Sequence, residues 1–270
     1  MNKNNLFHNI KRTIYYFLIR QIRKINNTIT KNKKHKFLFI LCPPYSGSTL
    51  LNQIISTSKN VSCNNELGVR EGQLLPGVKH FMFTKDRWTQ ETKYDWQKIK
   101  NVWLQYWDHS KNILLDKSSP NIIHLNDIQK VFEESYFIIM VRNPYAQAEG
   151  IIRRNKTTAD YAAQFVLKCL KYQKKNIEEK CRSIFFTYEE LCDQPSSFLN
   201  KLTDFLPELS DIDIHAKFKA HNFKTKKKMA VQNLNEEKIN RLTKDQIEKI
   251  NSYFVKEKHL LDFFNYEILD

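Results

Sequence analysis

The most constraining stretch of the chain is 36–55, which reads KFLFILCPPYSGSTLLNQII. Its first part, 37–42, is an unbroken apolar run between a basic segment and two prolines, which favours a short buried strand of a parallel sheet. A helix is expected next, because the leucines and isoleucines of 50–55 recur at the spacing of one buried helical face. A strand, a tight loop with Gly47 and a helix N-terminus together predict a binding site for a phosphate or sulfate group.

The loop departs from the pattern of a nucleotide triphosphatase. That pattern, GxxxxGK[ST], requires a lysine where this chain has Ser48, and its first glycine is missing as well. The sequence therefore disfavours a P-loop kinase, which would also need ligands for Mg²⁺. From the loop alone, a plain strand-to-helix turn without a ligand is the alternative.

Residues 44–50, Pro-Tyr-Ser-Gly-Ser-Thr-Leu, resemble the 5′-phosphosulfate loop of sulfotransferases that use 3′-phosphoadenylyl sulfate (PAPS). The common form of that loop is Pro-Arg-Ser-Gly-Thr-Thr-Leu. The family usually has Arg or Lys at the second position, where it stabilises charge on the transferred group, so a tyrosine there is a departure. The resemblance implies that the cofactor contacts Tyr45, Ser46, Gly47, Ser48 and Thr49.

A sulfuryl transfer to a hydroxyl needs a base, and a carboxylate can take that proton. In the tyrosylprotein sulfotransferases, the branch most similar in motif spacing, a Cys-Gly-Glu-Glu stretch ends in the base. The segment 63–66, Cys-Asn-Asn-Glu, lies at the same distance from the loop. The resemblance therefore implies that Glu66 is the catalytic base, the alternative being a solvated loop acid. For Glu71, five residues later, a solvated loop acid is the expectation.

A second apolar strand is expected over 112–116 and is followed by Lys117. Polar residues at the carboxyl end of a strand in an open α/β sheet lie in the ligand crevice. We therefore expect Lys117 to place a positive charge on the leaving phosphate or on the transferring group, as the family resemblance also implies. The alternative is an ordinary surface lysine.

The third strand, 136–141, is followed by Arg142-Asn143-Pro144, which resembles the 3′-phosphate motif of the family. An arginine presents a planar, permanently charged fork to a phosphate monoester. The family has a serine in the helix that follows, and Gly150 stands at that position here. The missing hydroxyl is expected to weaken phosphate binding by about 1.5–3 kcal/mol unless another donor substitutes.

Two later segments complete the nucleotide site that the resemblance implies. Tyr188 follows a fourth strand over 183–187, where the family has a tyrosine near the nucleotide, and ordinary packing is the alternative. The segment 216–229 is basic, and its Lys227 and Lys228 are expected to close over the phosphates of the nucleotide. The alternative for this segment is a solvated charged face.

The net charge of +15 is concentrated at the N-terminus: residues 1–36 hold ten Lys/Arg and no acid, leaving 34 basic against 29 acidic residues elsewhere. This distribution does not favour a nucleic-acid partner. Apolar residues of 10–25 share one helical arc with arginines largely opposite, which predicts a basic amphipathic helix lying on an anionic membrane. Packing of that arc on the protein's own core is the alternative. The apolar run 14–19 is far shorter than the ~20 residues of a membrane span.

These features predict a three-layer α/β domain of P-loop-like type, with a mostly parallel central sheet of at least four strands, over 36–270 after a basic segment over 1–35. The five cysteines form no CxxC pair, so reduced thiols are expected, and no cluster of metal ligands is evident. The resemblance implies a PAPS-dependent sulfotransferase that modifies a carbohydrate, glycolipid or tyrosyl hydroxyl and releases adenosine 3′,5′-bisphosphate. A non-catalytic sulfotransferase-like binding protein is the alternative. A cytoplasmic protein with peripheral membrane contact is expected.

Overall fold

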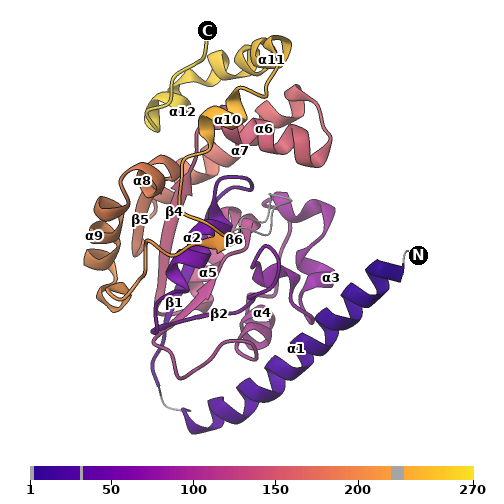
Figure 1. Ribbon diagram of the computed structural model, residues 1–270, viewed down its shortest axis with the longest axis vertical. Helices are drawn as coiled ribbons and strands as arrows, with labels where there is room; N and C mark the ends of the chain where they lie inside the picture. Colours follow the sequence, from indigo (N-terminus) through magenta and orange to yellow (C-terminus); the bar gives the residue numbers. More distant parts are fainter. Residues whose placement is uncertain (1–2, 31–32, 220–227) are drawn as a thin grey trace.

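The computed structural model describes residues 3–30, 33–219 and 228–270. Its centre is a five-stranded parallel sheet with the strand order β2-β3-β1-β4-β5 (Figure 1). The strands are β1 (Lys36–Leu41), β2 (Val61–Cys63), β3 (Ile113–Asp116), β4 (Ser135–Val141) and β5 (Ser183–Thr187). A separate antiparallel pair is formed by β6 (Phe218–Lys219) and β7 (Lys228–Met229).

The central strand β1 is apolar on both faces, which explains why helices cover both sides of the sheet. Leu38 and Ile40 belong to one buried cluster, and Phe39 and Leu41 belong to another, with all four side chains fully buried. Alternating side chains point to opposite faces of a strand, so a strand of this kind must be covered twice. The three-layer α/β prediction is confirmed.

The helices divide between these two faces and one end of the molecule (Figure 1). On the Leu38 face lie α2 (Ser48–Ile55), α8 (Tyr188–Asp193) and α9 (Pro195–Phe205), and on the Phe39 face lie α3 (Lys79–Met82), α4 (Trp96–Trp103), α5 (Leu125–Val131) and α7 (Ala159–Glu178). A third cluster joins α7 to α6 (Pro144–Asn155), α10 (Asn235–Ile239), α11 (Lys244–Phe254) and α12 (Lys258–Phe263). The short 3₁₀ turns are Gly72–Leu74, Lys85–Trp88, Ser119–Ile123, Pro207–Leu209 and Val255–Glu257.

The elements expected from the sequence are present, with one refinement. The sheet, expected to have at least four strands, has a fifth, because β2 pairs with β3 as the outermost strand on that side. Near the C-terminus, α11 and α12 are separated by a 3₁₀ turn at Val255–Glu257.

The N-terminal helix α1 (Lys3–Ile29) runs along the outside of the molecule (Figure 1). The side that faces the domain is mixed: Tyr16 is buried in the hydrophobic cluster on the Phe39 face, Arg23 pairs with Asp108 at 2.6 Å, and Asn27 donates to the carbonyl of Trp107 at 3.1 Å. The opposite arc is exposed by 48–67% at six apolar residues: Ile10, Ile14, Phe17, Leu18, Ile22 and Ile25. The alternative that this arc packs on the protein's own core is therefore wrong.

In the part of the chain that the structure describes, no helix is both long enough and apolar enough to span a bilayer. The boundary between residues 35 and 36 stays a prediction, although β1 begins at Lys36.

Candidate active site

The consecutive strands β3 and β4 lie on opposite sides of β1. In an open α/β sheet, the carboxyl end of a strand at such a switch point is where ligands bind. The loop that leaves β1 turns through two left-handed residues, Tyr45 (φ 66°) and Gly47 (φ 91°). A Cβ atom on Gly47 would lie only 2.5 Å from the ring of Tyr188, so this position requires glycine. The turn directs the loop into the N-terminus of α2, where an anion is favoured.

The hydroxyls of this loop have different environments. Ser46 and Ser48 are buried, and Ser46 Oγ has no hydrogen-bond partner among the described residues. Thr49 Oγ1 donates to the carbonyl of Val69 at 3.3 Å and accepts from Lys117 Nζ at 3.4 Å. The loop therefore contacts the residue that follows β3.

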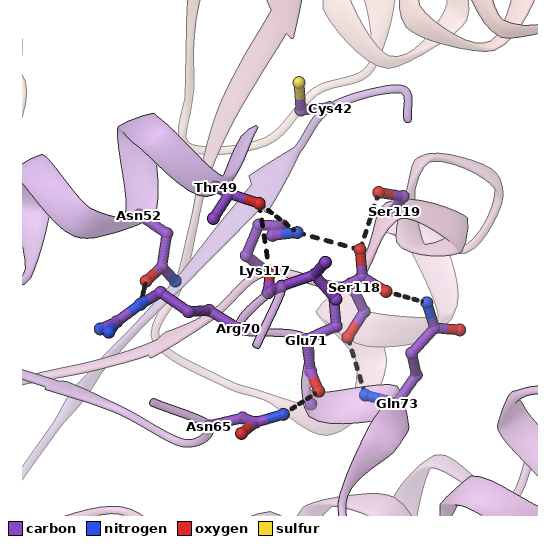
Figure 2. A network of polar contacts seen from close by, with 12 residues as sticks. Cys42, Thr49, Asn52, Asn65, Arg70, Glu71, Gln73, Lys117, Ser118 and Ser119 are labelled. Atoms are coloured by element: carbon purple, nitrogen blue, oxygen red, sulfur yellow. Dashed lines mark hydrogen bonds and ion pairs between the residues drawn. The ribbon is translucent and has the colours of Figure 1, made fainter. Parts of the chain in front are cut away.

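Lys117 connects the loop to a carboxylate. Figure 2 shows its side chain between Thr49 and Glu71, and Lys117 Nζ lies 2.9 Å from Glu71 Oε1. The lysine is 1% exposed, and Ser119 Oγ and Gln73 Nε2 also donate to the Glu71 carboxylate. An ammonium, a carboxylate and a loop hydroxyl are thus held together at the carboxyl end of the sheet's strands.

Asp116 fixes the segment that carries Glu71. Its buried carboxylate accepts from Asn64 Nδ2 at 2.8 Å, from the amide of Gly72 at 3.1 Å and from Asn121 Nδ2 at 2.9 Å. Burial raises the pKa of Asp116 to about 6, against the opposing effect of these donors. A Cβ atom on Gly72 would lie 2.1 Å from Asp116 Oδ1, so the approach is too close for any other residue.

Glu66 has a different position. It is exposed, and it accepts a hydrogen bond of 3.4 Å from the hydroxyl of Tyr15 on α1. Burial and the neighbouring Glu66 raise the pKa of Tyr15 to about 12. The structure therefore brings Glu71, which the sequence suggested was a solvated loop acid, to Lys117, and it turns Glu66 toward α1.

Arg142 forms a second group at the ends of β4 and β5. Its guanidinium lies 3.9 Å from the ring centre of Tyr188, donates to Asn235 Oδ1 at 2.7 Å and donates to the carbonyl of Tyr45 at 3.2 Å. Its Nη2 is buried and has no hydrogen-bond partner in the described ranges. Burial also lowers the pKa of Arg142 from its ordinary value. A cation with an unused donor therefore lies beside the anion-binding loop.

A sequence profile described as that of the sulfotransferase family matches residues 38–211, well over half of the chain, including the loop, Glu71, Lys117, Arg142 and Tyr188. The chain belongs to the sulfotransferase family.

Relatives of known name agree with this family. A Caenorhabditis briggsae protein named as a candidate protein-tyrosine sulfotransferase is 23% identical over an alignment of 196 residues, and the alignment covers 63% of this chain and 65% of that protein. The chain thus spans a little under two thirds of the length of this relative.

Solved structures share the sulfotransferase fold. The sulfotransferase domain of the Synechococcus PCC 7002 olefin synthase superposes with a TM-score of 0.51 at 18% identity, covering 88% of this chain and 98% of that one. A sulfotransferase from Alicyclobacillus acidocaldarius gives a TM-score of 0.53 at 11% identity, covering 86% and 97%.

The two departures from the sulfotransferase motifs are in contact with each other. A Cβ atom on Gly150 would lie 2.7 Å from Tyr45 Cβ, so a serine here would overlap the tyrosine. The hydroxyl of Tyr45 is directed along α6 and donates to Asn155 Oδ1 at 2.5 Å. The tyrosine in the loop and the glycine in the helix thus form a matched pair.

Most of the expected site residues lie at the carboxyl ends of the parallel strands. Lys227 lies outside the described residues, and Lys228 is described only by its backbone in β7. Sequence patterns predicted only a solvated acid at Glu71 and no site role for Asn235, whose side chain accepts from Arg142 and lies on α10. The Asn235 contact joins residues 93 positions apart, and no local pattern identifies it.

Proposed function

We propose that this protein is an active enzyme that transfers a sulfuryl group from PAPS to a hydroxyl acceptor. The observation that carries the proposal is the chain of contacts from Glu71 through Lys117 to Thr49. Sulfuryl transfer needs both charged groups, because the attacking hydroxyl loses a proton and negative charge develops on the leaving oxygen.

The loop and the arginine group fit the two anionic ends of PAPS, which supplies the sulfuryl group and leaves as adenosine 3′,5′-bisphosphate. We assign the loop amides with Ser46, Ser48 and Thr49 to the phosphosulfate, and Arg142 to the 3′-phosphate. Ser46 Oγ and Arg142 Nη2 support this fit, because both are buried donors without a partner in the described part of the chain. Such an atom costs about 1–3 kcal/mol, which an anionic oxygen would offset.

Glu71 replaces Glu66 as the proposed base. Its carboxylate accepts the proton of the acceptor hydroxyl, while Lys117 stabilises the negative charge next to the loop. Tyr45 carries no positive charge and its hydroxyl bonds to Asn155, so we assign to Lys117 the charge stabilisation that the family usually obtains from the loop.

Calorimetric titration with adenosine 3′,5′-bisphosphate, beside 5′-AMP as a ligand without the 3′-phosphate, tests the cofactor. A clear preference for the bisphosphate is expected, because only that ligand reaches both anion groups. Equal affinity, or no binding of either nucleotide, would favour a non-catalytic sulfotransferase-like protein, the alternative suggested by Tyr45 and Gly150. A P-loop kinase is disfavoured by the missing loop lysine.

Matched Glu→Gln variants test the base. Transfer from radiolabelled PAPS is measured with Glu71→Gln and, as the control, Glu66→Gln five residues away. We expect Glu71→Gln to slow transfer about 10²–10⁴-fold and to keep bisphosphate affinity, while Glu66→Gln retains wild-type transfer. Slow transfer in Glu66→Gln with normal transfer in Glu71→Gln would return the base to Glu66.

We propose a tyrosyl or a carbohydrate or glycolipid hydroxyl as the acceptor. The relative's name favours tyrosine, whereas an acceptor carried by a lipid fits a protein that docks on a membrane. A panel of tyrosyl peptides, oligosaccharides and glycolipids, assayed with radiolabelled PAPS, separates these classes.

We also propose that the exposed arc of α1 contacts an anionic membrane. The arc is apolar, and the helix belongs to a segment with ten basic and no acidic residues, so both lipid tails and anionic headgroups would attract it. Phe17 is 61% exposed on this arc, and Phe263 is 40% exposed on α12.

Cosedimentation with phosphatidylserine-containing vesicles compares Phe17→Ser with the control Phe263→Ser. The proposal expects weaker binding of the first variant alone. Equal binding of both variants and the wild type would contradict it. Concentration-dependent dimerisation that Phe17→Ser abolishes would assign the arc to a second copy of the chain instead.

A further inference from the structure

Lys238 lies in an unusual place for a lysine. It is on α10, which packs against α6, and it is 8% exposed. A Cβ atom on Gly150 would lie 3.2 Å from Lys238 Nζ. The ammonium therefore borders the position at which the family motif has a serine side chain.

The contacts of Lys238 do not satisfy a buried ammonium well. Its Nζ donates to the carbonyl of Ala146 at a long 3.3 Å, and the nearest carboxylate oxygen, Glu149 Oε2, lies 3.9 Å away. The other oxygen of Glu149 accepts from Arg153 and Arg241. Lys238 thus shares one carboxylate with two permanently charged arginines.

The charges around Lys238 are mostly positive. Arg142 approaches from the end of β4, Arg153 from α6 and Arg241 from beyond α10. Three acids oppose these groups: Glu149 lies nearest to Lys238, Glu237 pairs with Arg241, and Glu189 acts on Arg142, so four basic side chains face three acidic ones. Burial, followed by repulsion from Arg142, lowers the pKa of Lys238 to about 7. This cluster would accept a doubly negative group, and Arg142 Nη2 is a buried donor there without a partner among the described residues.

We propose that Lys238 is the second cationic ligand of the 3′-phosphate, in place of the serine that Gly150 lacks, and that it takes up a proton when the nucleotide binds. This inference rests on the proposed function, since it takes the 3′-phosphate to lie at Arg142. The neutral amine accepts one proton from solvent and then donates to a phosphate oxygen. A phosphate monoester with a second pKa near 6 is already a dianion at pH 7.5, so the ligand cannot be the group that gains this proton.

The experiment is calorimetric titration of the full chain with adenosine 3′,5′-bisphosphate and 5′-AMP, at pH 6 and pH 8, in phosphate-free buffers of different ionisation enthalpy. The buffer dependence of the measured heat gives the number of protons taken up. For the bisphosphate, the wild type should take up protons at pH 8, and at pH 6 it should instead release those that the half-protonated phosphates lose. For 5′-AMP it should take up none at either pH.

Two variants at position 238 distinguish the effect of a positive charge on bisphosphate affinity from the uptake of a proton. Lys238→Met should lose the proton uptake and bind the bisphosphate about tenfold more weakly or worse, with 5′-AMP affinity unchanged. Lys238→Arg should keep more of the affinity and still lose the uptake, because its charge is permanent. Lys244→Met, at an exposed lysine of α11, is the control and should match the wild type.

The possible failures differ from one another. If wild-type protein prefers the bisphosphate but shows no proton uptake at pH 8, or if Lys238→Met keeps both the preference and the uptake, the assignment of Lys238 is overturned and the proposed function stands. If wild-type protein binds neither nucleotide, the proposed function falls, and this inference with it.

Discussion

Two buried lysines lie near the proposed anion-binding loop, Lys117 next to Thr49 and Lys238 next to Gly150, and their surroundings differ. Lys117, at the end of β3, is 2.9 Å from a carboxylate oxygen of Glu71 and contacts Thr49. Lys238, on α10, lies 3.9 Å from a carboxylate that two arginines already share. On the Lys117 side the two charges pair with each other, whereas on the Lys238 side basic groups outnumber acidic ones.

This difference indicates on which side of the site the charges are balanced only when a ligand is bound. A paired ammonium and carboxylate hold each other in place before any substrate arrives, which suits groups that must be positioned for a proton transfer. An excess of buried positive charge is relieved when a lysine loses its proton or when an anion binds. We therefore attribute chemistry to the Glu71 side and nucleotide affinity to the Lys238 side.

The strongest test of this division is Lys117→Met. Removal of the cation should slow sulfuryl transfer about 10²–10³-fold, as the loss of one group that stabilises developing charge does in other enzymes. Bisphosphate binding should keep its preference over 5′-AMP. The measurement is transfer from radiolabelled PAPS beside calorimetry, and a variant that lost only the nucleotide preference would show that the two sides are not separate.

A second test concerns how the Glu71 side is built. Gly72→Ala forces a methyl group against Asp116 and should destabilise the fold by about 3 kcal/mol, at the upper end of overpacking effects. Gly68→Ala is the control: no atom lies within 4 Å of its added Cβ, and only its φ of 61° carries a strain of about 1–2 kcal/mol. Urea unfolding measures both variants, and equal losses would contradict the tight packing at Gly72.

The pH dependence of stability tests Asp116. Its folded pKa of about 6 is above the ordinary value of 3.8, so the folded state binds the proton more tightly than the unfolded chain. The stability that this group contributes is full below pH 4 and is lost as the pH rises to 6, by up to about 3 kcal/mol. The unfolding free energy of the wild type minus that of Asp116→Asn should therefore fall over this range. A flat difference would mean that the pKa is not raised.

The smallest effect is expected at the matched pair of Tyr45 and Gly150. Gly150→Ser should cost about 1–2 kcal/mol, because the new side chain overlaps Tyr45. Tyr45→Gly, which removes the Cβ atom that the new side chain meets, should relieve most of that cost in the double variant, and a double-mutant cycle of unfolding free energies measures it. Additive costs would show that the two positions are independent.

The sequence predicted the fold well because the sheet is encoded locally. Apolar runs such as 37–42 and 136–141 are long enough to be recognised and are followed by turn residues. The same locality explains why the anion loop and Arg142 could be placed at one edge, since parallel strands bring their carboxyl ends together.

The proposed catalytic base could not be predicted from local sequence patterns. Glu66 matches the motif by counting residues from the loop, but the side chain that reaches Lys117 is decided by how Asp116 binds Gly72 and Asn64 across two strands. Lys238 was not predicted as a site residue for a similar reason, because its neighbour Gly150 is 88 positions earlier in the sequence. For α1, the helical period identified the apolar arc, and the structure shows that the helix is held to the domain through the opposite side, by Tyr16, Arg23 and Asn27.

The attachment of α1 has a consequence for the rate of the reaction. Tyr16 on α1 donates to Asn65 Oδ1 at 3.2 Å, and Asn65 Nδ2 donates to the backbone carbonyl of Glu71 at 2.7 Å. Two hydrogen bonds therefore lead from the outer helix to the proposed base. If α1 adheres to a surface and Glu71 is the base, as proposed, a pull on the helix would reach Glu71 through these two bonds, and attachment would be coupled mechanically to the position of the base.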